Sequence, residues 1–129
     1  MPTPEELKLA LDAVQNLEGL RRDIRQNAQG YIDQLAGGGS VAKITVIALQ
    51  DTDQYLRRFG WQNRLVISMP LLTKLTNGLL GVGVTAAVMD ASYTEMLNAV
   101  NAFRAAAPGD LSGATTMLLA SIAPHDTVW

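Results

Sequence analysis

Residues 3–40 read TPEELKLALDAVQNLEGLRRDIRQNAQGYIDQLAGGGS, and this stretch decides the fold. Its beginning is typical of a helix N-terminus, with Thr3 as the capping residue, Pro4 in the first helical position and Glu6 three residues after the cap. Its end is the run Gly37-Gly38-Gly39, where a positive φ carries no steric cost. The sequence therefore predicts one helix over residues 4–36, about 50 Å long at 1.5 Å per residue.

Apolar residues recur with a seven-residue spacing along this helix. One seam contains Leu7, Val14, Arg21, Ala28 and Leu35, and the other contains Ala10, Leu17, Ile24 and Tyr31. The flanking positions are also apolar, at Leu11, Ala13, Leu20 and Ile32, whereas a two-stranded coiled coil carries mostly charges there. The wide apolar stripe favours a helix packed against two neighbours in a bundle, with a coiled coil as the alternative.

A second helix is expected to follow the glycine run and to form an αα-hairpin at Gly37–Ser40. Ser40 can cap it and Gly60 comes after its expected end. Its apolar face would contain Val41, Ile44, Ala48, Tyr55 and Phe59. Residues 41–49 are rich in β-branched side chains, so a strand is the alternative there.

Three further helices are expected in the second half of the chain. A short one begins near Ser68 and ends near Asn77, and a last one covers about Ser112 to Ala123. Between them, a helix ending before Pro108 either is continuous from Val84 or restarts at Ser92, which could form a capping box with Glu95. The predicted fold class is therefore all-α with about five helices, as one domain over residues 1–123 with a C-terminal arm over residues 124–129.

Composition narrows the possible partners and location. The chain has 129 residues, a net charge of −2 and no cysteine. The charge argues against nucleic acid or an anionic membrane as partner, and the lack of thiols excludes disulfides and the usual zinc sites. No stretch has the roughly 18 apolar residues of a membrane span, and the first residues do not form a signal peptide. We expect a cytoplasmic protein, or part of a virion assembled in the cytoplasm.

Two glycine-containing stretches come near to phosphate-binding motifs but lack essential parts. Gly37–Ser40 with Lys43 does not have the Walker spacing, and Gly81-x-Gly83 has no acidic residue about 20 positions later. His125 is the only histidine, and its neighbour Asp126 is badly placed to assist it because it is adjacent in sequence. The sequence therefore predicts no cofactor, no metal site, no small-molecule substrate and no enzymatic activity, and a fold that does not depend on His125.

Charge is distributed unevenly along the chain. Residues 1–64 hold eight basic and eight acidic residues, whereas residues 65–129 hold only two basic and four acidic residues. A solvent-covered bundle usually carries more charge than the second half does. Either the first half wraps the second, or much of the second half faces other subunits.

The candidate interface residues are those whose type is common at protein–protein contacts. Arg21 interrupts an apolar seam, where it either pairs with Glu18 or makes an inter-subunit ion pair. The others are Arg57, Arg58, Trp61 and Arg64 in a basic and aromatic cluster, and Val128 and Trp129 at the C-terminal end.

The functional hypothesis is a non-catalytic assembly subunit of a homo-oligomer or larger symmetric particle. A small bacteriophage virion component, such as a connector, cement or accessory head protein, is one concrete setting, with other structural proteins as further partners. The alternative is a helical binding module or regulator with a single protein partner.

Overall fold

The computed structural model describes residues 4–61 and 86–127, and within them the chain forms four α-helices and one short 3-10 helix. The helices are α1 (Pro4–Ala36), α2 (Val41–Trp61), α5 (Ala86–Ala106) and α6 (Leu111–Ile122), followed by η1 (Ala123–Thr127). The predicted all-α class is confirmed, with four helices rather than about five in the described ranges. The helix expected near Ser68–Asn77 lies outside them.

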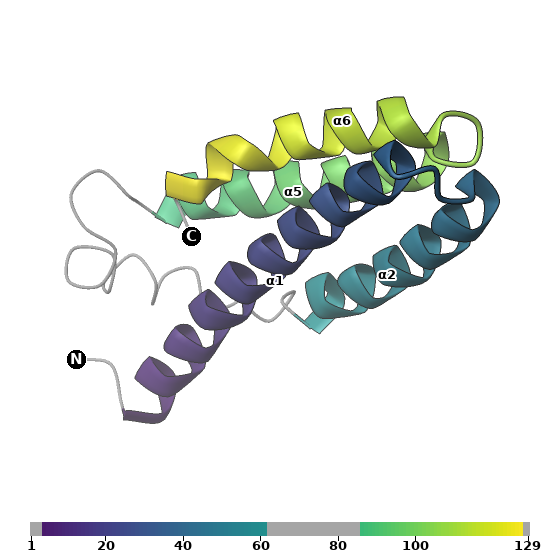
Figure 1. Cartoon of the computed structure of the whole chain (residues 1–129). Coiled ribbons are helices and arrows are strands. Elements are labelled where there is room, and N and C mark those ends of the chain that lie inside the picture. Colours follow the sequence, from purple (N-terminus) through teal and green to yellow (C-terminus); the bar gives the residue numbers. More distant parts are fainter. Residues whose placement is uncertain (1–3, 62–85, 128–129) are drawn as a thin grey trace.

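The four helices form a bundle in which each helix packs on two neighbours (Figure 1). α1 packs against α2 and α6, and α5 packs against the same two helices. α1 and α5 therefore face each other across the core, where the rings of Tyr31 and Phe103 stack with centroids 6.3 Å apart. None of the described helices combines the length and the apolar composition needed to cross a bilayer.

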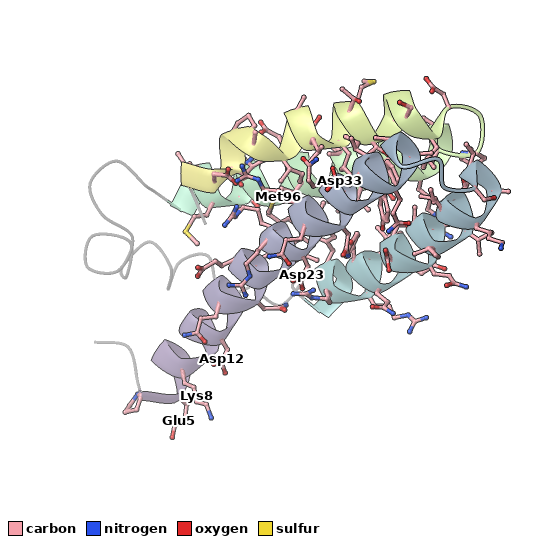
Figure 2. All side chains as sticks on the ribbon, viewed as in Figure 1. Glu5, Lys8, Asp12, Asp23, Asp33 and Met96 are labelled. Atoms are coloured by element: carbon pink, nitrogen blue, oxygen red, sulfur yellow. The ribbon has the colours of Figure 1, made fainter. Side chains whose placement is uncertain are left out.

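α1 has the predicted bounds, and its buried side chains follow the predicted seams. Leu17, Ile24, Ala28 and Tyr31 are all in the core, together with the flanking residue Leu20. Charged side chains project from the first turns of α1, among them Glu5, Lys8 and Asp12 (Figure 2). The wide apolar stripe thus fits a bundle helix with two neighbours, as α2 and α6 provide.

The predicted hairpin between α1 and α2 is confirmed. Gly38 has a φ of +85°, and the amide of Gly39 donates to the Gln34 carbonyl at 2.8 Å. A Cβ on Gly39 would lie 2.8 Å from that carbonyl oxygen, so the turn requires a residue without a side chain there. The chain reverses within four residues because these two positions are glycine.

Residues 41–49 are helical, so the strand alternative is wrong. The amide of Lys43 lies 3.4 Å from the Ser40 hydroxyl oxygen, as expected for a capping serine. Two details of the prediction need correction. Val41 is 57% exposed, because it begins the helix beside the exposed turn, and the helix continues through Gly60 to Trp61.

α5 is a single helix from Ala86, so Ser92 does not begin a helix. Its side chain is buried in the bundle, and the alternative of a second start at Ser92 is wrong. α6 begins one residue earlier than predicted, at Leu111, because Asp110 caps it by accepting from the Gly113 amide at 3.0 Å. α6 ends at Ile122, and Pro124 lies within the 3-10 helix η1 that follows it directly.

The core is apolar and is built by all four helices. Its buried residues are Leu17, Leu20, Ile24, Ala28, Tyr31, Ile44, Ala48, Tyr55, Phe59, Met89, Tyr93, Met96, Val100, Phe103, Ala107, Leu111, Ala114, Leu118 and Ile122. Fully burying one such large side chain stabilises the fold by about 1.5–3 kcal/mol. The second half of the chain thus supplies more than half of these residues despite its few charges.

Candidate functional site

Arg21 lies at the edge of the buried face of α1, with only 14% of its side chain exposed. Its guanidinium forms an ion pair with Asp126 of η1, and the same carboxylate pairs with Arg25. Arg21 therefore does not pair with Glu18, its predicted local partner. The contact joins residues 105 positions apart and fastens the C-terminal segment to α1.

The basic and aromatic cluster near the end of α2 does not form one surface. Tyr55 and Phe59 are buried in the core, and Arg58 donates to Asp23 of α1 at 2.7 Å. Of the two arginines of the cluster that the structure describes, Arg57 is exposed and makes no ion pair with a described residue. The side chain of Trp61 and all of Arg64, Val128 and Trp129 lie outside the described part of the chain. Their place in an interface stays a prediction.

His125 has partners that the sequence did not indicate. Its side chain is buried, and its Nδ1 lies 2.7 Å from the hydroxyl oxygen of Ser92 on α5. Its Nε2 lies 3.4 Å from a carboxylate oxygen of Glu95, one turn further along α5. The histidine borders a shallow groove of about 420 Å³ between α5 and α6, which is lined by Glu95, Asn98, Ala99, Ala102, Ser121 and His125.

The side chains of Ser92, His125 and Glu95 lie side by side, as in an enzyme where a histidine base activates a serine nucleophile. The geometry does not support a nucleophilic role for Ser92. A nucleophilic serine must reach a substrate, whereas Ser92 is 3% exposed. Among the described residues that line the groove, Ser121 is the one with a hydroxyl. Within residues 4–61 and 86–127, no group of three or more acidic, histidine or cysteine residues could hold a metal ion. The arrangement is best explained as a hydrogen-bonded anchor for η1.

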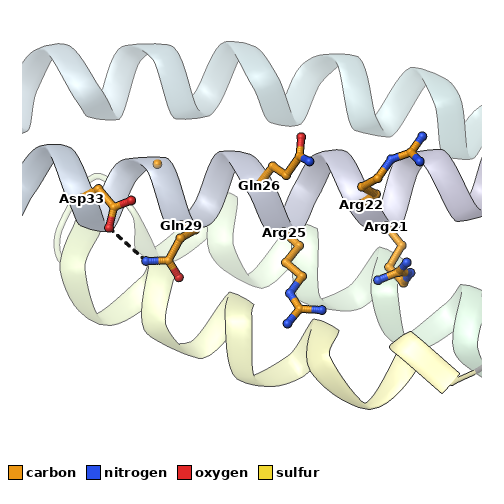
Figure 3. A pocket seen from close by; sticks show the side chains of 7 residues that line it. Arg21, Arg22, Arg25, Gln26, Gln29 and Asp33 are labelled. Carbon is orange, nitrogen blue, oxygen red and sulfur yellow. Dashed lines mark hydrogen bonds between the residues drawn. The ribbon is translucent and has the colours of Figure 1, made fainter.

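A second surface lies along the solvent-facing side of α1. It is a shallow groove of about 610 Å³ lined by Arg21, Arg22, Arg25, Gln26, Gln29, Gly30 and Asp33 (Figure 3). All seven residues belong to one helix. Arginines lie at one end and Asp33 lies at the other, where it accepts from the Gln29 amide at 3.0 Å. We call this the α1 groove.

A third surface is the outer side of α6. From Leu111 to His125 the chain has no lysine, arginine, aspartate or glutamate. The exposed residues of this stretch are all uncharged, and among them Met117 has a large apolar side chain that is 70% exposed. We call the exposed residues Ser112, Thr116, Met117, Ala120, Ser121 and Ala123 the α6 surface.

The tyrosines form buried polar contacts between helices. Tyr31 of α1 donates to Asp51 of α2, and Asn27 of α1 donates to the Tyr55 hydroxyl. Burial, with the Asp51 carboxylate as a second cause, holds the pKa of Tyr31 well above its usual range. Burial also raises the pKa of Tyr55 to about 12, and the hydrogen bond from Asn27 opposes this rise. Because both pKa values are raised, the two hydroxyls stay protonated at neutral pH, and their hydrogen bonds link α1 to α2.

Comparison with known proteins gives no match. No family model, no curated protein and no solved structure matches the chain. The three surfaces described above are therefore the candidates for a function.

Proposed function

We propose that this protein is a non-catalytic assembly subunit that associates with further copies of itself. The observation that carries the proposal is the α6 surface, a charge-free side of a helix that exposes Met117. Interfaces between identical subunits are depleted in charge at their centre and enriched in methionine. Because a surface without charge needs no oppositely charged partner, it can pack on its own copy in a two-fold arrangement.

The arrangement around His125 supports the same proposal. The hydroxyl hydrogen-bonded to this histidine belongs to a buried serine, so the pair fastens η1 to α5 rather than meeting a substrate. The pair holds η1 beside the C-terminal end of the α6 surface. A surface that is held in place before association loses less conformational entropy than a mobile one.

A small virion component such as a connector, cement or accessory head protein is one concrete setting for such a subunit. Its support is the combination of small size, helical fold and a surface suited to self-association. A helical binding module with one protein partner is the alternative. Val46 and Ile47 on α2, which are 56% and 48% exposed, would be the natural contact for such a partner.

The proposal is tested by the molar mass of the protein in solution, measured by light scattering over a wide range of concentrations. The wild-type protein should exceed the mass of one chain, and Met117→Glu should shift it toward the single chain. Val46→Glu is the matched control, because it places the same charge on a similarly exposed apolar position of another helix. A wild-type protein that stays a single chain throughout would overturn the proposal in favour of the binding module.

A further inference from the structure

The α1 groove has basic residues at one end and an acidic residue at the other. Arg22 is exposed and makes no ion pair with a carboxylate in the described part of the chain. Asp33 is exposed at the other end, and its carboxylate accepts only the amide of Gln29 there. A second helix running in the opposite direction would place its own acidic end beside Arg22 and its own basic end beside Asp33.

The residue spacing of the groove fits such a second copy of α1. Arg22, Gln26, Gln29 and Asp33 follow one another at intervals of four, three and four residues, so they lie along one side of the helix. With a two-fold axis passing between Asn27 and Ala28, Arg22 lies opposite the second copy's Asp33. In the same register Gln26 lies opposite the second copy's Gln29, and their side-chain amides can both donate and accept.

Gly30 leaves open space on the same side of α1. A glycine inside a helix is destabilising relative to alanine, so its presence calls for a compensating contact. A Cβ built on Gly30 would meet no atom within 4 Å, which means that no described part of this chain uses the space. The missing side chain at Gly30 allows a second helix to approach this side of α1 closely.

We propose that the α1 groove is a two-fold contact in which α1 of one copy packs antiparallel on α1 of another. This inference rests on the proposed self-association and adds to it a second, polar surface. A subunit with two separate self-complementary surfaces, on α1 and on α6, builds an assembly larger than a dimer. The α1 contact supplies orientation, since exposed ion pairs and amide pairs add little affinity.

Charge reversal tests the pairing. Arg22→Asp and Asp33→Arg each place like charges opposite one another at two symmetric positions, so each should weaken the association through α1 by about tenfold. The combined variant, with both reversals, should restore the wild-type mass because the charge pairs form again with exchanged signs. Light scattering of the four proteins at matched concentrations measures this. Single variants with unchanged mass, or a combined variant as weak as the singles, would overturn the inference.

Disulfide cross-linking tests the direction of the helices independently. The natural chain has no cysteine, so Gln26→Cys and Gln29→Cys each introduce a single thiol. In the antiparallel register, a mixture of the two variants should cross-link to the mixed pair more than either variant cross-links to itself. Preferential self-linking of each variant would indicate parallel helices and overturn the inference. Gln54→Cys on α2 is the control for random collision.

The two proposals can fail separately. If Met117→Glu reduces the mass but the charge reversals do not, the assembly function stands and the α1 contact is wrong. If the wild-type protein is a single chain at every concentration, both are wrong.

Discussion

The Nδ1 atom of His125 lies 2.7 Å from the hydroxyl oxygen of Ser92, and both side chains are buried, although 33 positions separate them in the sequence. The pair ties η1, which ends the described chain, to the middle of α5. The expectation that the fold does not depend on His125 is therefore replaced by the opposite prediction.

Ser92→Ala should lower the free energy of unfolding by about 1–3 kcal/mol, because it leaves a buried imidazole nitrogen without this hydrogen bond. The loss should appear in urea denaturation at neutral pH, with helical circular dichroism retained before the transition. Ser121→Ala is the matched control, since Ser121 is exposed and borders the same groove. Equal stability of the two variants would show that the Ser92–His125 contact contributes nothing.

The course of the helices could be predicted wherever the decisive information is local. Pro4, the glycine run and the spacing of Leu17, Ile24 and Tyr31 are contained within a few turns of chain, and they gave α1 its correct bounds and buried side. The alternative of a helix start at Ser92, which is wrong, arose for the same reason. A serine followed three residues later by glutamate looks the same whether or not the residues before it are helical, and here Ala86–Ala91 continue the helix.

The contacts of the candidate surfaces could not be predicted, because they depend on which distant segments meet. Arg21 finds Asp126 across 105 positions only because α6 packs against α1 and carries η1 along its side. The residues of the proposed α1 contact, Arg22, Gln26, Gln29 and Asp33, are polar and follow one another at helical spacing in the sequence. Their proposed pairing depends on a second helix, so the pattern within one chain does not define it.

Gly38→Ala should destabilise the hairpin between α1 and α2 by about 1 kcal/mol, because a φ of +85° is strained for a residue with a Cβ. Gly37→Ala is the control in the same turn. Gly37 does not have a positive φ, and its Cβ would come no closer than 3.4 Å to another atom. Thermal unfolding of both variants measures the difference, and a loss at Gly37 as large as that at Gly38 would contradict the backbone explanation.

The three tyrosines of the chain should resist ionisation until the protein unfolds. Burial is the first cause of the raised pKa at Tyr31, at Tyr55 (to about 12) and at Tyr93. In the unfolded chain tyrosine titrates near pH 10. Above that pH the unfolded state has lost protons that the folded state still holds, so stability is fully present below about pH 10 and falls as the pH rises further.

Absorbance of tyrosinate near 295 nm should therefore rise in the native protein only at a higher pH than in urea, and together with loss of helical structure. Asp51→Asn should lower the pKa of Tyr31 by removing the carboxylate that accepts its hydrogen bond. A native protein in which all three tyrosines titrate near the unfolded value would contradict their burial.

Asp126→Asn should be more damaging than the loss of an ordinary surface charge. Asp126 neutralises both Arg21 and Arg25, and Arg21 is largely buried with an Nε that has no hydrogen-bond partner within the described residues. An amide in place of the carboxylate leaves a largely buried guanidinium without its counter-charge, which we expect to cost about 2 kcal/mol in the free energy of unfolding.

The ion pair between Arg104 and Asp53 provides the comparison, because its side chains are 44% and 46% exposed. Exposed pairs are typically worth less than about 1 kcal/mol, so Asp53→Asn should have a small effect that vanishes in high salt. Urea denaturation of the two variants in low and high salt separates the cases. If Asp126→Asn is as mild and as salt-sensitive as Asp53→Asn, then Asp126 is only a surface charge and does not hold η1 on α1.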